Sequence, residues 1–170
     1  ERLLEFSGTD SLREELPYWK AVTDPGQETE AGAAMSPMSG RENREGATKT
    51  LIYSLAIEET QALLKQVPAV YNTQINDVLL TALTRAWGRW SGGKALFTDL
   101  EGHGREEIPG DLDPSRTVGW FTSIYPVRLE LPEAGSDWRP GEALKSVKEQ
   151  LRCIPRRGVG YGILRYIAAD

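Results

Sequence analysis

The segment from Glu101 to Glu106 concentrates the groups of this chain that are best suited to proton transfer. It reads Glu-Gly-His-Gly-Arg-Glu and holds the chain's only histidine, His103. The two glycines allow a tight turn that would bring Glu101, His103 and Arg105 into one small volume. A carboxylate at a strand end can donate or accept a proton when burial raises its pKa toward neutrality. The alternative is an acid–arginine pair that only holds the loop in shape.

Metal and thiol chemistry fit this sequence poorly. One histidine with carboxylates at Glu106, Glu107, Asp111 and Asp113 lacks the His and Cys spacing of zinc sites and the ligand pattern of calcium loops. We therefore expect no metal site. Cys153 has no matched histidine, so we expect a small buried side chain rather than a nucleophile.

Two other glycine-containing segments have weaker functional signals. Residues 116–126 carry two large aromatics, which favours a core strand, although Gly119 would let a substrate or a backbone approach closely. Residues 155–162 read Pro-Arg-Arg-Gly-Val-Gly-Tyr-Gly and match neither a P-loop nor a dinucleotide fingerprint. We expect this second segment to be a flexible or tightly turned surface loop.

A strand over residues 95–101 is predicted to carry the first of these segments. Its period of two places Asp99 and Glu101 on one face, together with Ala95 and Phe97. Two carboxylates on one strand face are unusual for a core element. Strand ends that run into glycine loops are common locations for chemistry.

One long helix has the clearest periodicity in the chain. We expect a core helix that begins after a cap at Asn72 or Thr73 and ends at Ser91-Gly92-Gly93. Its apolar stripe consists of Ile75, Val78, Leu79, Ala82, Leu83, Ala86, Trp87 and Trp90.

The remaining elements alternate between strand and helix, which predicts an α/β fold. Pro17 breaks the first helix, Pro68 ends the second, and Pro126 marks a bulge or a sheet edge. The predicted elements are a helix over 10–22, a connector over 23–47, a strand over 48–55, a helix over 58–65, an extended stretch over 117–131, and a helix from Pro140 with a stripe of Leu144, Val147 and Leu151.

Composition sets the broad class of the protein. The chain has 170 residues, 39% hydrophobic and 26% charged, which is typical of one globular domain. The net charge of −5 argues against a general nucleic-acid binder, and no apolar run is long enough to span a bilayer. A single cysteine fits a reducing cytoplasm. Because the chain begins at Glu1 without an initiator methionine, we expect it to be an excerpt from a longer protein.

Four stretches together resemble the C-terminal half of an epimerization domain from a nonribosomal peptide synthetase. They are residues 71–82 (YNTQINDVLLTA), 101–106 (EGHGRE), 116–126 (RTVGWFTSIYP) and 158–166 (GVGYGILRY). Residues 15–19 (ELPYW) resemble the family's connector out of its first half. By this resemblance, the second and third stretches favour epimerization domains over ordinary condensation domains.

The resemblance implies a fold and a division of the chain. The fold would be a chloramphenicol-acetyltransferase-like subdomain, a mixed sheet packed with helices. Residues 1–22 would be a helical connector, 23–47 a long loop, and 48–170 the C-terminal subdomain. Two such subdomains would form a V, with the active site in a tunnel between them.

The resemblance also implies an activity. The enzyme would invert the α-carbon of an aminoacyl or peptidyl thioester from L to D. A carrier domain would deliver this substrate on its phosphopantetheine arm, with no cofactor bound by the chain itself. Glu101 matches the family's catalytic carboxylate, and His103 and Arg105 match positions of the supporting loop. The candidate tunnel residues are Gly119, Trp120 and Tyr161.

The chain departs from the family pattern in two places. It lacks the two-histidine motif of the family's first half, and it stops before the family's closing Asn-Tyr motif. We therefore expect it to need the missing N-terminal subdomain as a partner and to be inactive alone. The alternatives are a condensation domain that forms peptide bonds, or an inactive module that docks the acidic carrier through Arg152, Arg156 and Arg157.

Overall fold

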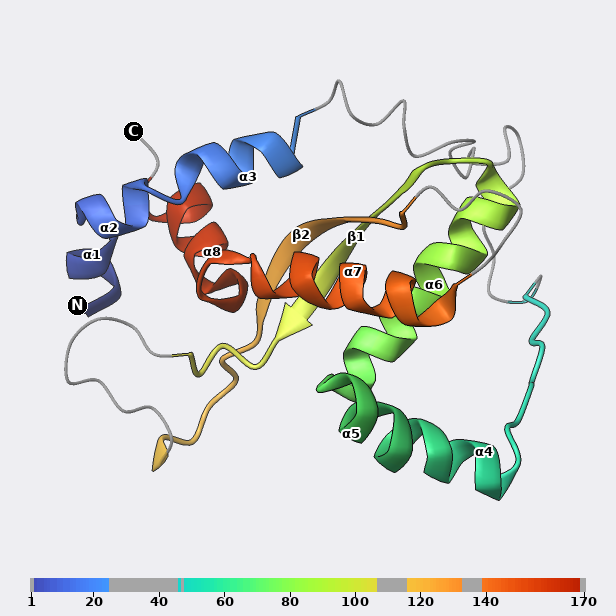
Figure 1. The fold of residues 1–170 in the computed structure, drawn as a ribbon. Helices are drawn as coiled ribbons and strands as arrows, with labels where there is room; N and C mark the ends of the chain where they lie inside the picture. The colour runs from blue at the N-terminus through green and yellow to red at the C-terminus, as the bar shows by residue number, and fades with distance from the viewer. Residues whose placement is uncertain (1, 25–45, 47, 107–115, 133–138, 169–170) are drawn as a thin grey trace.

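The structure, a computed structural model, describes residues 2–24, 46, 48–106, 116–132 and 139–168. Its centre is a two-stranded antiparallel sheet of β1 (Ala95–Gly102) and β2 (Ser123–Glu130), against which helices pack (Figure 1). The α/β class is therefore confirmed. Within the described residues the sheet is antiparallel.

Among the described residues, the two faces of this sheet differ in burial toward the end of β1 that carries Glu101. Tyr125, Val127 and Leu129 of β2 are buried, and on β1 the residues opposite them continue the same face. Asp99 and Glu101 lie on the opposite face and are exposed. The predicted strand and its division into two faces are both confirmed.

Helix α7 (Pro140–Arg152) crosses the covered face of the sheet (Figure 1). Its Ala143, Leu144 and Val147 are buried, and Val147 joins the core formed by β2 and Trp19. The predicted start at Pro140 is confirmed. Proline suits the first turn, where its missing N–H has no partner within the helix.

The glycine-rich segment after α7 is not a surface loop. It forms a 3-10 turn, η5 (Pro155–Gly158), and then helix α8 (Val159–Tyr166). Gly158 and Gly160 are buried, and Gly158 has a φ of 87°. A Cβ at Gly158 would overlap the Tyr125 ring, so glycine here allows close packing on the sheet.

Three short helices precede the sheet and pack partly against α8. They are α1 (Arg2–Ser7), α2 (Asp10–Arg13) and α3 (Leu16–Val22) (Figure 1). The predicted broken helix over 10–22 is confirmed, and Pro17 stands in the first turn of α3. Leu12 and Trp19 are buried, whereas α1 was not predicted.

Helix α6 (Ile75–Ser91) ends as expected but begins later than predicted. Gly92, with a φ of 73°, closes its C-terminus. The Gln74 N–H donates to the Asp77 carboxylate at 2.8 Å and starts the helix. The predicted cap at Asn72 or Thr73 is wrong, because the cap is Gln74 and Asn72, with a φ of 51°, ends the preceding helix instead.

The predicted burial of α6 is wrong in part. Leu79, Leu83 and Trp90 of the apolar stripe are 56%, 48% and 64% exposed. The buried residues are Thr81 and Thr84, whose hydroxyls donate to backbone carbonyls one turn earlier at 2.6 and 2.7 Å. The helix thus turns a threonine-containing face inward, and much of its apolar stripe faces solvent.

Residues 48–56 form no strand, so that prediction is also wrong. Leu51, Ile52 and Tyr53 are 80%, 84% and 91% exposed. β-Branched and aromatic residues favour a strand only where a neighbouring strand pairs with them. Within the described residues, β1 and β2 pair with each other, and this segment runs outside them (Figure 1).

A continuous helical stretch follows, longer than expected. It consists of α4 (Ile57–Gln61), a π-helical turn η3 (Ala62–Gln66) and α5 (Val67–Tyr71). Pro68 does not end this stretch, because it stands in the first turn of α5, where its missing N–H is tolerated.

Two side-chain predictions are wrong. Cys153 is exposed rather than buried. Trp120 is 91% exposed, because β2 begins only at Ser123.

Most of the predicted connector, residues 25–45 and 47, lies outside the described residues. None of the helices in the described ranges is both long and apolar enough to cross a membrane.

Two tyrosines, the buried Tyr125 and the half-buried Tyr18, are expected to make the protein less stable at alkaline pH. Burial raises the pKa of Tyr125 and of Tyr18, and for Tyr125 the Glu106 carboxylate adds to the shift while Arg157 opposes it. The unfolded chain therefore loses these phenol protons first. We expect the free energy of unfolding to be fully kept below about pH 10 and to fall as the pH rises through the folded pKa.

Urea unfolding of the chain between pH 8 and 11.5 measures this effect. Tyr125→Phe should flatten the alkaline loss, whereas Tyr53→Phe, at a 91% exposed position, should leave it unchanged. Equal flattening by both variants would show that burial of Tyr125 is not the cause.

Candidate functional site

A cavity of about 840 Å³ lies between the end of β1, the start of α6 and the end of α7. Apolar side chains of the sheet and of α7 form part of its wall, including Leu100, Tyr125 and Leu151. Its acidic, basic and histidine residues are Asp77, Glu101, His103, Glu106, Arg152 and Arg157. The cavity therefore combines an apolar base with carboxylates and guanidinium groups.

Glu101 borders this cavity because of its place at the end of the strand. It is the second-last residue of β1 and lies opposite Ile124 of β2, and both residues are exposed. Gly102 and Ser123 form the last pair, and the chain then leaves the sheet. Glu101 is thus held by a paired strand and is exposed, and it borders the cavity next to Leu100 and Tyr125, whose side chains lie on the other face of the sheet.

The imidazole of His103 has partners at both nitrogens. Nδ1 accepts a hydrogen bond from the Arg105 backbone N–H at 3.0 Å, and Nε2 lies 3.0 Å from Glu106 Oε1. An accepting Nδ1 carries no proton, so in this geometry the Nε2–H donates a hydrogen bond to the Glu106 carboxylate. The other Glu106 oxygen lies 3.7 Å from Arg157 Nη1. His103 and Glu106 are thereby fixed against each other beside Glu101.

Arg105 joins the loop after β1 to the segment before β2. Its Nη2 donates to the carbonyls of Thr117 at 2.9 Å and Gly119 at 3.4 Å. Its guanidinium lies 4.4 Å from the centre of the Phe121 ring, in the geometry of a cation–π contact. The structure therefore places Arg105 beside Gly119.

The candidate tunnel residues are not gathered around Glu101. Gly119 and Trp120 are exposed, and Tyr161 packs in the core with its ring 5.2 Å from that of Trp19. None of these three residues lines the cavity that contains Glu101.

The wall at the start of α6 was not expected to have a role. Asn72, Thr73 and Asn76 line the cavity there. The Thr73 hydroxyl is buried and has no hydrogen-bond partner among the described residues, which leaves it available to a bound molecule. The signal for this wall was the run of small polar residues before the long helix.

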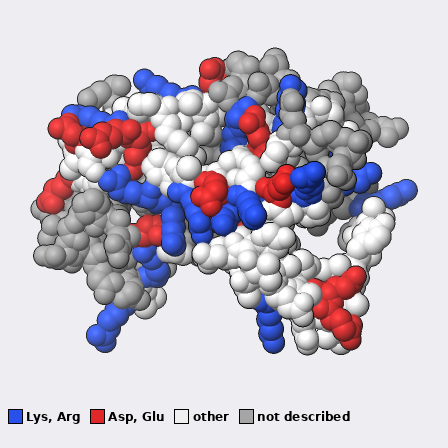
Figure 2. All heavy atoms as spheres, in the orientation of Figure 1, with Lys and Arg blue, Asp and Glu red and all other residues white. Residues whose placement is uncertain are grey.

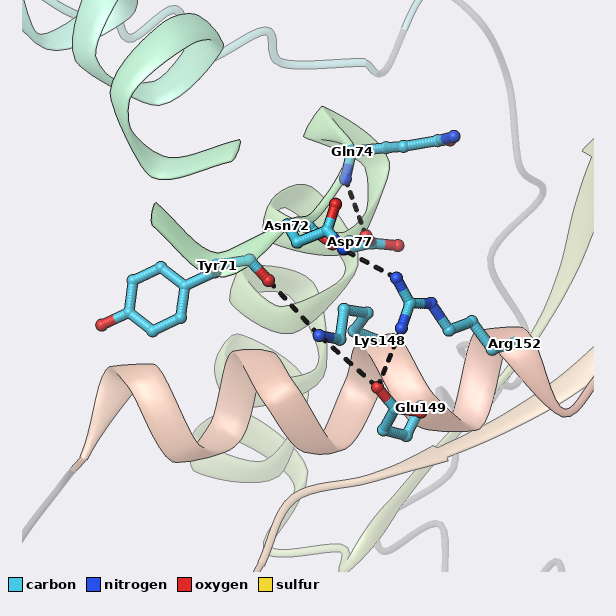
Figure 3. Close-up of polar contacts among 7 residues, drawn as sticks. All are labelled: Tyr71, Asn72, Gln74, Asp77, Lys148, Glu149 and Arg152. Carbon is cyan, nitrogen blue, oxygen red and sulfur yellow. Dashed lines mark hydrogen bonds and ion pairs between the residues drawn. The ribbon is translucent and has the colours of Figure 1, made fainter. Parts of the chain in front are cut away.

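Helix α7 holds that wall in place through the end of α5. Lys148 Nζ donates to the Tyr71 carbonyl and Arg152 Nη2 to the Asn72 carbonyl, each at 3.3 Å (Figure 3). Carbonyls at a helix C-terminus carry partial negative charge, so cations stabilise them. Glu149 lies 3.4 Å from Lys148 and 3.2 Å from Arg152 and completes the cluster.

The comparison with known families decides the identity of this fold. The family model described as "Condensation domain" matches residues 1–170, the whole chain. The chain belongs to the condensation-domain family.

Relatives of this condensation-family chain are large synthetase proteins. It is 50% identical over 167 residues to one of the linear gramicidin synthase proteins of Brevibacillus parabrevis, a match that covers 98% of this chain and 2% of the relative. It is 44% identical over 171 residues to surfactin synthase subunit 1 of Bacillus subtilis (strain 168), covering 99% of this chain and 4% of the relative. The chain thus spans a small part of the curated relatives that it matches.

A solved structure shares the fold. The chain superposes on the crystal structure of the epimerization domain from the third module of tyrocidine synthetase B with a TM-score of 0.81 and 36% identity. The match covers 99% of this chain and 36% of that one. The fold expected from the resemblance is therefore confirmed.

The charged groups on the face shown in Figure 2 are mixed in sign rather than uniformly basic. Basic and acidic groups lie side by side across the middle of one face (Figure 2), and on α7 these include Lys148, Glu149 and Arg152. Arg156, from the predicted carrier-docking cluster, pairs with buried Glu15.

Among the described residues, no group of three or more His, Cys, Asp or Glu could hold a metal ion, and Glu107, Asp111 and Asp113 lie outside them.

Gly104 tests how tightly the loop after Glu101 is packed. Its φ is 66°, and a Cβ there would overlap the Phe121 carbonyl oxygen. We expect Gly104→Ala to lower the free energy of unfolding by about 2–4 kcal/mol, since a left-handed alanine is strained and must also displace the backbone at Phe121.

Gly92 provides the matched control, because its φ is 73° but open space surrounds its Cβ position. Gly92→Ala should cost only the conformational strain, about 1–2 kcal/mol. Both values come from urea unfolding of the chain. An equal loss in the two variants would contradict tight packing at Gly104.

Proposed function

We propose that this chain is part of an epimerization domain that inverts the α-carbon of an aminoacyl or peptidyl thioester from L to D. The observation that carries the proposal is the fold match to a solved epimerization domain, at 36% identity over 99% of this chain. The exposed Glu101, at the end of β1 and among the residues that line the cavity, supports it.

The chemistry of inversion accounts for a carboxylate in this place. A thioester acidifies the neighbouring α-proton, so a positioned base can remove it if the resulting enolate is stabilised. Inversion then needs a proton delivered to the opposite face. Glu101 is our candidate for one of these two proton transfers, with the second group supplied by another part of the synthetase.

The cavity suits a substrate delivered on a flexible arm. Its volume of about 840 Å³ falls in the range of small-molecule sites, roughly 300–1,000 Å³. In this proposal a carrier domain of the synthetase delivers the thioester on phosphopantetheine, and the chain binds no cofactor of its own. Arg105 and His103 would support the loop, through their contacts to 117–121 and to Glu106.

Peptide-bond formation is the second candidate, because the matching family model describes condensation domains. A condensation domain would join a donor thioester to an acceptor amine without exchanging the α-proton. That difference separates the two reactions experimentally.

The test uses the longer synthetase protein that contains this chain, with its carrier loaded with an L-aminoacyl thioester in deuterated water. We expect the wild type to incorporate α-deuterium and to form the D-isomer. Glu101→Gln should lower the rate of inversion by about 100-fold or more, as expected for loss of a general acid or base. The readouts are mass spectrometry for deuterium and chiral chromatography for the D:L ratio.

Asp99→Asn is the matched control. Asp99 lies on the same face of β1, two residues earlier, and is exposed without lining the cavity. The rate of inversion by the Asp99→Asn variant should stay within about twofold of the wild-type rate, as for surface substitutions generally. Amide formation without α-deuterium in the wild type would replace the proposal with condensation, and carrier binding without either reaction would favour a docking module.

A further inference from the structure

A partly buried ion pair connects the N-terminal helices to the turn before α8. Glu15, which is 5% exposed, pairs with Arg156 and accepts a hydrogen bond from Trp19 Nε1 at 3.0 Å. Arg156 also donates to the Ser11 carbonyl at 3.2 Å and to the Ser11 hydroxyl at 2.6 Å. These bonds compensate the buried charges, and loss of either partner would leave a charge unpaired.

The backbone of that turn is unfavourable on its own. Arg156 and Arg157 are consecutive and both left-handed, with φ values of 41° and 49°. Residues with a Cβ rarely adopt this conformation, and it persists where surrounding contacts hold it. The contacts of Arg156 with Glu15 and Ser11 stabilise this conformation from one side of the turn.

The other side of the turn contacts the loop that follows Glu101. Arg157 Nη1 lies 3.7 Å from Glu106 Oε2, and Glu106 Oε1 lies 3.0 Å from His103 Nε2. The Arg157 carbonyl also faces Gly102, where a Cβ would lie 3.6 Å from it. A continuous series of contacts therefore runs from the buried carboxylate to the cavity.

Glu15, at the start of this series, is tightly packed. A Cβ at Gly160 would overlap the Glu15 carboxylate, so the start of α8 lies directly against it. Trp19 donates a hydrogen bond to the same carboxylate, and the centre of its ring lies 6.3 Å from that of Tyr125. Tyr125 in turn lines the cavity.

We propose that Glu15 is a positioning residue for the Glu101 site, because its ion pair with Arg156 fixes the Arg156–Arg157 turn and, through Glu106, the loop of residues 102–106. Its catalytic consequence rests on the proposed epimerization. Glu15 itself touches no reacting group. Its removal should therefore reduce turnover without weakening substrate binding.

The test compares Glu15→Gln with two controls in the longer synthetase protein. Glu14→Gln removes the adjacent, exposed carboxylate. Leu12→Val loosens a 0% exposed residue that packs with Phe6 and Ile163 and takes no part in the ion pair. It therefore serves as a control for general destabilisation of the same helices.

The first readout is amide hydrogen exchange, measured by mass spectrometry on peptides that cover residues 102–106. Glu15→Gln should speed exchange there by about 10-fold, whereas both controls should stay within about twofold. Should Glu15→Gln fail to fold, Arg156→Lys keeps the charge but loses the forked bonds to Ser11, and it should show the same local effect.

The second readout is α-deuterium incorporation. In Glu15→Gln we expect kcat to fall by about 10-fold and KM for the loaded carrier to stay within about twofold, as for a misplaced catalytic group. Unchanged exchange at residues 102–106 would overturn the positioning role, and faster exchange with an unchanged kcat would overturn its link to Glu101. If the wild type incorporates no α-deuterium, the proposed epimerization is refuted but the positioning role of Glu15 is not. The amide-exchange measurement then decides whether Glu15 holds the loop of residues 102–106.

Discussion

The antiparallel pairing of β1 with β2 is the constraint on which the rest of the structure depends. Leu96 lies opposite Leu129 and Leu100 opposite Tyr125, and this row packs against α3, α7 and the turn after α7. Side chains alternate along a strand, so burying this row directs Glu101 to the opposite face, where it is exposed. A shift of the register by one residue would place the carboxylate in the core and expose the apolar row.

Helix α7 couples the second wall of the cavity to that same core. Val147 is buried against the sheet, while Lys148 and Arg152 bind the last carbonyls of α5. The chain then reverses at Asn72, and α6 begins over the cavity. The end of β1 and the start of α6 belong to different parts of the sequence, yet both are held by one helix that packs on the sheet.

Local rules predicted the elements whose determinants lie close together in the sequence. The period of two in 95–101 and the start at Pro140 needed no distant partner. The prediction of a strand over 48–55 was wrong because a content of β-branched and aromatic residues does not specify which strand would pair with it. The apolar stripe of α6 identified an apolar face but not what covers it, and the packing glycines at 155–162 were mistaken for loop residues. Within the site, the segment 101–106 was found from its residue types, whereas the contacts of Glu15 depend on segments about 140 residues apart.

The exposed stretch of residues 51–56 has a consequence for the behaviour of the protein in solution. Its sequence, Leu-Ile-Tyr-Ser-Leu-Ala, has no charge, proline or glycine, and Leu51, Ile52 and Tyr53 are at least 80% exposed. Uncharged hexapeptides of this composition stack readily into intermolecular cross-β ladders. Concentrated stocks of the 170-residue chain should therefore lose material to fibrillar precipitate over time, and a lysine placed within this hexapeptide would prolong their shelf life.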